Sequence, residues 1–105
     1  MTKIPEEVTK IKEIIVSSFN VNKIFLFGSY AKGNFNDNSD FDICIITDDS
    51  KRKLDLLRLI RKKVYNYISI PMDMLIYRSD EFEERADKLD SIEREIRQNG
   101  IKLYG

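Results

Sequence analysis

Residues 24–46, IFLFGSYAKGNFNDNSDFDICII, decide the fold of this chain of 105 residues. An apolar run ends at Gly28-Ser29, and after ten further residues Asp40-Phe41-Asp42 opens a second apolar run, Ile43 to Ile46. Apolar runs of this length, bounded by turn residues, predict two buried strands. The pattern therefore places a Gly-Ser turn at the end of one strand and a pair of acids at the start of another.

Asp40 and Asp42 are candidate metal ligands. Side chains two residues apart in a strand share a face, so the two residues lie about 7 Å apart along the chain. Their carboxylates repel each other, and Asp42 borders an apolar run in which an unpaired charge would cost several kcal/mol. A bound cation would relieve both costs. Because the chain has no histidine and one cysteine, oxygen ligands and Mg²⁺ are favoured over a zinc-type site.

Asp73 is the predicted third ligand, because it is the only other acid within a strand-like apolar stretch, Ile70 to Tyr77. Gly28 and Ser29 are the predicted phosphate-binding residues. Gly28 has no Cβ, so a phosphate can approach its backbone closely. Ser29 supplies a hydroxyl donor at the start of a predicted short helix, whose backbone amides attract an anion.

Each of these residues also has an ordinary structural role. Gly28 could form only a turn, Ser29 could only cap a helix, and Asp40 could belong to the polar loop that includes residues 34–39. The order of strand, Gly-Ser turn, loop and Asp-x-Asp nevertheless favours a functional site. No Walker-type or dinucleotide-binding glycine motif occurs in the chain.

Residues 28–33, GSYAKG, followed by residues 39–43, SDFDI, resemble the signature of the minimal nucleotidyltransferases of the DNA polymerase β-like superfamily. Lys32 stands where arginine is commoner in that family, which keeps the charge but loses the bidentate fork. The resemblance continues through Asp73 to GIKLY at residues 100–104, which is similar to the family's usual ending. It therefore covers nearly the whole chain.

The resemblance implies a nucleotidyltransferase fold, an α/β (α+β) domain over residues 1–105. We expect a small mixed β-sheet of at least three strands, flanked by helices, with the carboxylates at one end of the sheet. By the same resemblance, one Mg²⁺ would be held by Asp40, Asp42 and Asp73, and a second by Asp40 and Asp42. Gly28 and Ser29 would bind the β and γ phosphates of ATP.

Stand-alone proteins of this kind resemble the antitoxin half of toxin–antitoxin pairs. In such pairs the antitoxin transfers AMP from ATP onto a tyrosine of a HEPN-domain ribonuclease toxin. The implied function is therefore Mg²⁺-dependent adenylyl transfer to a toxin, with which the chain would form a hetero-oligomer. Two alternatives stay open: an antitoxin that neutralises its partner by occlusion without catalysis, and a module that binds ATP and Mg²⁺ but transfers nothing.

Composition and the N-terminal sequence bear on nucleic-acid binding, on cellular location and on the role of the single cysteine. Lysine plus arginine number 18, as do aspartate plus glutamate, so no net charge draws the protein to nucleic acid. The N-terminus lacks the apolar stretch of a signal peptide and no run approaches a membrane span, so we expect a cytoplasmic protein. The single cysteine, Cys44, lies among isoleucines and is expected in the core.

Hydrophobic periodicity predicts the remaining elements. The expected elements are a helix over Pro5 to Phe19, strands over Lys23 to Phe27 and Phe41 to Thr47, a helix from Asp48-Asp49-Ser50 through Ile68, a strand over Ile70 to Tyr77, and one last helix from Ser79-Asp80 to just before Asn99-Gly100. Leu103-Tyr104-Gly105 is expected either to pack against the sheet or to contact a partner.

Two predicted helices carry opposite charges. Residues 51–63 contain seven bases and one acid, whereas residues 80–95 contain eight acids and three bases. Solvated helix faces and docking surfaces for oppositely charged partners both account for such patterns.

Overall fold

The computed structural model describes residues 4–33, 40–68 and 71–105. The predicted polar loop 34–39 and Ile70, the expected first residue of a strand, lie outside the described residues. The elements follow the chain in the order α1 (Glu6–Ser18), β1 (Lys23–Phe27), α2 (Ser29–Lys32), β2 (Phe41–Ile46), α3 (Lys53–Val64), a 3₁₀ turn η1 (Tyr65–Tyr67), β3 (Met72–Tyr77), α4 (Ser79–Ala86), α5 (Ile92–Asn99) and β4 (Ile101–Tyr104).

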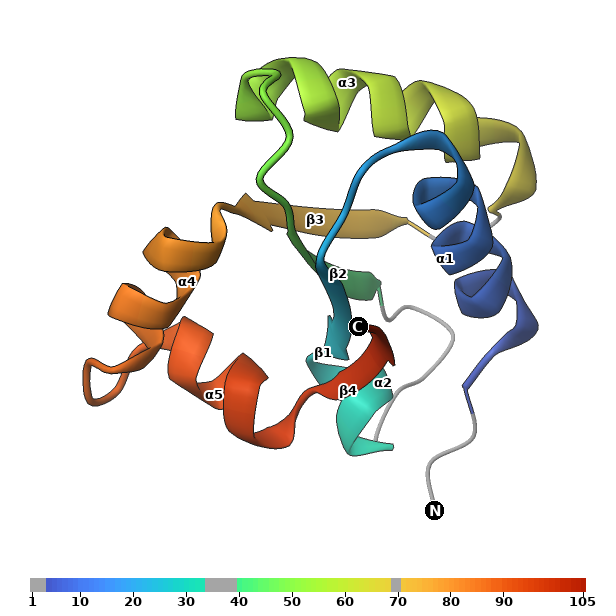
Figure 1. Cartoon of the computed structure of the whole chain (residues 1–105). Helices are drawn as coiled ribbons and strands as arrows, with labels where there is room; N and C mark the ends of the chain where they lie inside the picture. The colour runs from blue at the N-terminus through green and yellow to red at the C-terminus, as the bar shows by residue number, and fades with distance from the viewer. Residues whose placement is uncertain (1–3, 34–39, 69–70) are drawn as a thin grey trace.

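The strands form one mixed sheet in the order β3-β2-β1-β4 (Figure 1). β1 pairs with β2 and with β4 in antiparallel orientation, whereas β2 and β3 run parallel. The parallel pair requires a crossover connection, and α3 provides it. The predicted mixed sheet of at least three strands flanked by helices is confirmed.

Helices cover both faces of the sheet (Figure 1). Alternate side chains of a strand point to opposite faces, so Phe41, Ile43 and Ile45 join one buried cluster with α1 and α3. Cys44 and Ile46 join a second cluster, with α4 and α5. The central strand β2 is therefore buried on both faces, which explains its nearly continuous apolar sequence. Cys44 lies in the core, as predicted.

The prediction of one last helix is wrong, because α4 and α5 are separate (Figure 1). Between them the backbone of Asp90 has a φ of 64°, which no α-helix allows. Ser91 then caps the second helix by accepting a hydrogen bond from the Arg94 amide at 3.1 Å. Leu89 lies in the connection between the two helices and is 79% exposed.

The C-terminal strand β4 was not predicted as a strand. Residues Ile101–Tyr104 pair with β1, so the segment packs against the sheet, which is one of its two expected arrangements. Four residues give too short an alternation for a strand to be recognised from sequence.

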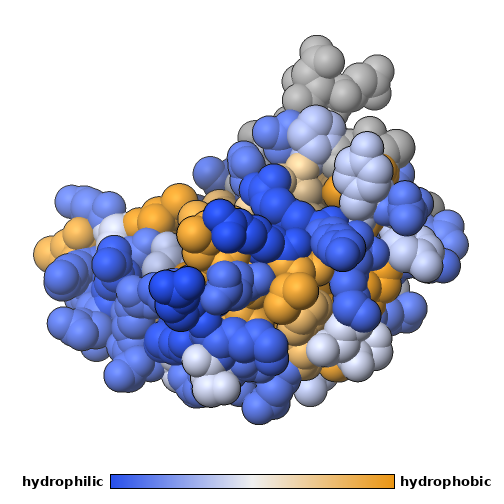
Figure 2. Space-filling view, turned by 90° about the horizontal axis from the view of Figure 1, so that it is seen from above, coloured by the Kyte–Doolittle hydropathy of each residue, from blue (hydrophilic) through white to orange (hydrophobic). Residues whose placement is uncertain are grey.

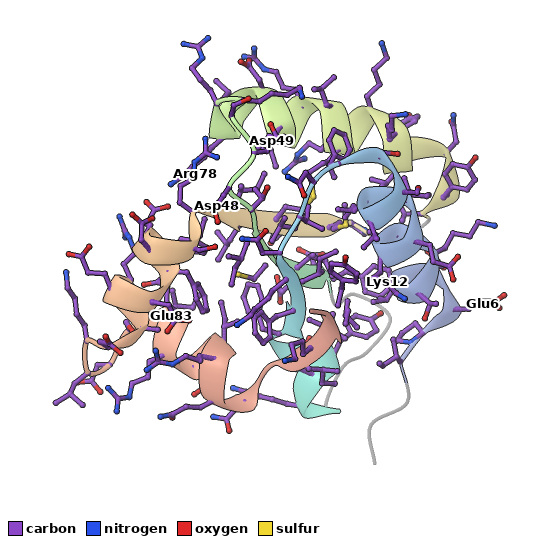
Figure 3. All side chains as sticks on the ribbon, viewed as in Figure 1. Glu6, Lys12, Asp48, Asp49, Arg78 and Glu83 are labelled. Atoms are coloured by element: carbon purple, nitrogen blue, oxygen red, sulfur yellow. The ribbon has the colours of Figure 1, made fainter. Side chains whose placement is uncertain are left out.

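The start of α3 was also predicted wrongly. The helix begins at Lys53, and Asp48 serves a different purpose. Its carboxylate accepts hydrogen bonds from the Ser79 amide at 3.1 Å and the Asn22 side chain at 2.7 Å. Figure 3 shows Asp48, Asp49 and Arg78 together where β2 leads toward α3. The hydrogen bonds lower the pKa of Asp48 and tie the ends of β2 and β3 together.

Tyr77, Glu93 and Cys44 form a buried polar group beneath α5. The Tyr77 hydroxyl donates a hydrogen bond to Glu93 Oε2 at 2.7 Å, and Glu93 is only 7% exposed. Burial, followed by the nearby Glu93 carboxylate, raises the pKa of the Cys44 thiol to about 12. No helix in the described part of the chain has the length and apolar character needed to cross a membrane.

The Tyr77–Glu93 hydrogen bond can be tested by matched substitutions. We expect Tyr77→Phe to lower the free energy of unfolding by about 1–3 kcal/mol, because it leaves a buried carboxylate without its donor. Glu93→Gln keeps an acceptor oxygen for the hydroxyl and should cost less. Urea unfolding of the three proteins measures both changes, and a larger loss in Glu93→Gln would contradict the role given to this hydrogen bond.

Candidate active site

Asp40, Asp42 and Asp73 lie at one end of the sheet. In the parallel pair of β2 and β3, Asp42 is the direct partner of Asp73, and neighbouring strands lie about 4.8 Å apart. Asp40 immediately precedes β2, two residues before Asp42. The register therefore brings together the carboxylates that the sequence analysis selected from separate stretches.

The three acids differ in exposure. Asp40 and Asp42 are half-buried, whereas Asp73 is exposed. The exposure of Asp73 differs from the apolar surroundings that its sequence neighbours predict. Asp73 is exposed because β3 is an edge strand of the sheet, and its neighbours Met72 and Met74 point to the opposite face, toward α3.

The electrostatics of the site centre on Asp42. Burial raises the pKa of its carboxyl, and the negative charges of Asp73 and then Asp40 raise it further. In the part of the chain that the structure describes, no lysine or arginine forms an ion pair with any of these three acids. The site thus holds negative charge that a bound cation would stabilise.

Gly28 lies directly against Asp42. The antiparallel register of β1 and β2 pairs Phe27 with Asp42, so the chain turns at the next residue, where Gly28 has a φ of 74°. A Cβ at this position would collide with Asp42 Oδ2. Glycine is therefore required here both by the backbone conformation and by the carboxylate beside it.

Ser29 is the first residue of α2. The N-cap position is occupied by Gly28, which has no side chain to cap the helix, so the simple helix-cap role expected for Ser29 is not observed. Within the described residues no hydrogen bond uses the Ser29 hydroxyl, which leaves it free to bind a ligand. The hollow beside Gly28 has a volume of only about 10 Å³.

The donor set suits a hard cation, since carboxylate oxygens are the ligands that Mg²⁺ prefers. The raised pKa of Asp42 shows that its negative charge is poorly compensated. The carboxylates do not meet at a single point, however. Among the residues that the structure describes, no group of three or more histidine, cysteine, aspartate or glutamate side chains is gathered tightly enough to hold a metal ion. The residues fit Mg²⁺ by chemistry, and their roles as ligands stay a prediction.

The sequence did not predict the buried polar group of Tyr77, Glu93 and Cys44. Cys44 follows Asp42 on the same face of β2, and Glu93 and Tyr77 lie next to it. The only sequence signal was a glutamate beside Ile92 in an amphipathic helix. Such a residue is indistinguishable from a surface acid until the helix is docked.

The chain is similar to known nucleotidyltransferases in sequence. Residues 8–103 match the model of a family described as "Nucleotidyltransferase domain". A curated relative from Methanocaldococcus jannaschii, named "Putative protein adenylyltransferase MJ1217", is 36% identical over 69 residues, which are 66% of this chain and 65% of that protein. The chain therefore spans less than two thirds of the length of this relative.

Solved structures show the same fold. A structure described as a toxin-antitoxin with AMP-PNP has a TM-score of 0.66 at 23% identity and covers 96% of this chain and 74% of its own. A tri-AMPylated Shewanella oneidensis HEPN toxin in complex with MNT antitoxin gives a TM-score of 0.57 at 19% identity, over 94% of this chain and 70% of that chain. The fold and the match over nearly the whole sequence confirm the resemblance: the chain belongs to the nucleotidyltransferase domain family.

Proposed function

We propose that this protein transfers AMP from ATP to a hydroxyl group of a partner protein, and that the acceptor is a tyrosine of a HEPN-type toxin for which it acts as the antitoxin. The observation that carries the proposal is the register that sets Asp42 beside Asp73 with Gly28 against it. Membership of the nucleotidyltransferase domain family supports nucleotidyl transfer. The names of two similar proteins support a toxin protein as the acceptor of AMP: one is named a putative protein adenylyltransferase, and the other is an antitoxin in complex with an AMPylated toxin.

Gly28 and Ser29 would bind the phosphate end of ATP. The absence of a side chain at Gly28 lets the phosphates approach the backbone, and the free Ser29 hydroxyl can donate a hydrogen bond to them. Asp40 and Asp42, with Asp73, would hold Mg²⁺. When bound, Mg²⁺ would neutralise the carboxylates and withdraw charge from the triphosphate. Binding of this kind aligns the leaving pyrophosphate opposite the attacking oxygen.

Asp73 would act on the acceptor. The acceptor oxygen forms a bond to the α phosphorus while the bond from that phosphorus to pyrophosphate breaks. The proton of the acceptor hydroxyl passes to the Asp73 carboxylate, which is suited to this role because it is exposed at the edge of the sheet. No covalent intermediate with the enzyme is required.

Transfer should depend on Asp42. We expect Asp42→Asn to lower the rate of AMP transfer by at least two orders of magnitude, or about 3 kcal/mol of barrier, because the amide is a poor metal ligand. Intact mass of a purified HEPN-type partner after incubation with ATP and Mg²⁺ reports the product. Asp80→Asn, an exposed acid on α4, is the matched control and should keep full activity.

Two results would contradict this assignment. If Asp42→Asn keeps most of the activity, Asp42 is not part of the reaction. If the wild-type protein inhibits its partner without any AMP-sized increase in mass, the protein acts by occlusion.

Nucleotide affinity should depend on the Gly-Ser turn. We expect Ser29→Ala to weaken ATP binding about tenfold or more, because one hydrogen bond to a charged group contributes about 1.5–3 kcal/mol. Gly28→Ala should weaken it further, since the new methyl group collides with Asp42. Calorimetric titration with ATP and Mg²⁺ measures both, and wild-type affinity in the two variants would remove phosphate binding from this turn.

The negative charge of Asp42 should lower the free energy of unfolding. Because the folded state raises the pKa of Asp42, its ionised form opposes folding. We therefore expect Asp42→Asn to be more stable than the wild type at neutral pH without metal. The difference should disappear as the pH falls below about 4, where the wild-type carboxyl is protonated in both states.

Ligand addition supplies the second arm of this experiment. ATP analogue with Mg²⁺ at a hundredfold excess over its dissociation constant should stabilise the wild type by about 2.7 kcal/mol. Asp42→Asn should respond little. Equal shifts of the two melting curves would show that Asp42 does not bind the metal.

A further inference from the structure

The two edges of the sheet differ in how well they are protected. β4 is only four residues long, carries Lys102, and has an irregular register with β1. β3 is six residues long, pairs in unbroken register with β2, and contains no lysine. Short length, lysine and bulges are the usual means of preventing an edge strand from pairing with another chain. β4 uses all three means, whereas β3 uses none of them and carries one exposed charge, Asp73.

The outer side of β3 offers backbone hydrogen-bonding groups. The carbonyl oxygens of Pro71 and Tyr77 accept hydrogen bonds from Phe41 and Thr47 on the β2 side, at 2.9 Å each. Because these groups alternate along a strand, the amides and carbonyls of Met72, Met74 and Ile76 point away from β2. Within the described part of the chain, β3 has no second strand partner.

Two apolar pockets lie along this edge, between α3 and β3. One has a volume of about 240 Å³ and is lined by Lys53, Leu54, Leu57, Met74 and Ile76. The other has a volume of about 210 Å³ and is lined by Arg61, Val64, Tyr65, Ile68 and Met72. Figure 2, seen from above the α3 side of the molecule, shows hydrophobic surface between hydrophilic side chains.

The second pocket lies at the end of β3 that carries Asp73, since Met72 is its neighbour in the chain. Alternate residues of an added strand would fill the pockets from the α3 face. The residue paired with Asp73 would point to the opposite face, on the same side as the Asp73 carboxylate. An extended segment bound at this edge is thus positioned to bring one side chain to the reaction site.

Charge indicates the chemistry of the segment. At the start of α3, Arg52 and Lys53 are ion-paired with Asp55 and Glu81. The later bases have no ion-pair partner among the described residues, and all are exposed: Arg58, Arg61, Lys62 and Lys63. Arg61 itself lines the pocket nearest Asp73. An acidic partner segment complements this charge.

We propose that the free edge of β3 binds an extended acidic segment of the acceptor protein. Apolar side chains at alternate positions occupy the two α3–β3 pockets, an acidic side chain pairs with Arg61, and the residue opposite Asp73 carries the reactive hydroxyl. The proposal rests on the proposed function, because it gives Asp73 the acceptor. It adds the surface that selects the acceptor and the sequence pattern that this surface selects.

The test uses the whole protein and a displayed library of short random peptides that each contain a tyrosine. Enriched peptides are measured by fluorescence anisotropy without ATP. Arg61→Glu is compared with Lys63→Glu, which makes the same charge change on the same helix. Lys63 lies two residues, or about 200°, around the helix from Arg61 and lines neither pocket. Melting curves verify that both variants fold.

We expect enriched peptides to alternate apolar residues and to contain aspartate or glutamate. Arg61→Glu should weaken their binding about tenfold or more, as for loss of a charge-assisted hydrogen bond, and Lys63→Glu less than about threefold. Methylation of the peptide backbone amides should also abolish binding. The proposal is overturned if no peptide is enriched or if the enriched peptides are basic. It is also overturned if the two variants have equal effects or if methylation does not change binding. Competition by an oligonucleotide at the same site, or self-association of the protein through this edge, would likewise overturn it.

Incubating the selected peptides with ATP and Mg²⁺ separates the two proposals. Peptide binding that depends on Arg61, without transfer of AMP or binding of ATP, would reject the proposed function but retain the docking edge. Transfer to these peptides at equal rates by the wild type and Arg61→Glu would reject the docking edge and retain the function.

Discussion

Burial of β2 on both faces is the constraint on which the rest of the structure depends. Phe41, Ile43 and Ile45 pack against α1 and α3, while Cys44 and Ile46 pack against α4 and α5. A strand fixed in this way cannot shift by one residue, because a shift would exchange the two sets of side chains. Its neighbours are consequently held in register, and the pairing of Asp42 with Asp73 follows from that register.

Acids at the two ends of β2 show what distinguishes a structural carboxylate from a functional candidate. Asp48, just beyond the strand, receives hydrogen bonds from Ser79 and Asn22, which lower its pKa. Asp42, at the start, is half-buried near other acids, and its pKa is raised. The fold stabilises the first charge and leaves the second uncompensated. Perturbation of the second kind, at an open edge beside a glycine turn, is typical of sites that bind a charged ligand.

The same asymmetry extends to the edges of the sheet. β4 closes one side with a short strand, whereas β3 leaves backbone groups and two apolar pockets accessible on the other. Asp73 lies on this open edge and is exposed. The third acid of the candidate site therefore lies on an edge strand, which among the described residues is paired with β2 on one side only.

The sequence by itself determined the three strands from β1 to β3 and predicted the candidate site residues, because apolar runs and the Gly-Ser and Asp-x-Asp spacings are local patterns. The mixed sheet and the family followed from the resemblance that these motifs carry. Only the tertiary structure decided that Gly28 lies against Asp42, that Asp73 is exposed, that Glu93 is buried beside Tyr77, that the last helix is broken at Asp90, and that Ile101–Tyr104 completes the sheet. These features depend on strand register and helix docking, which join residues far apart in the chain and leave no local pattern.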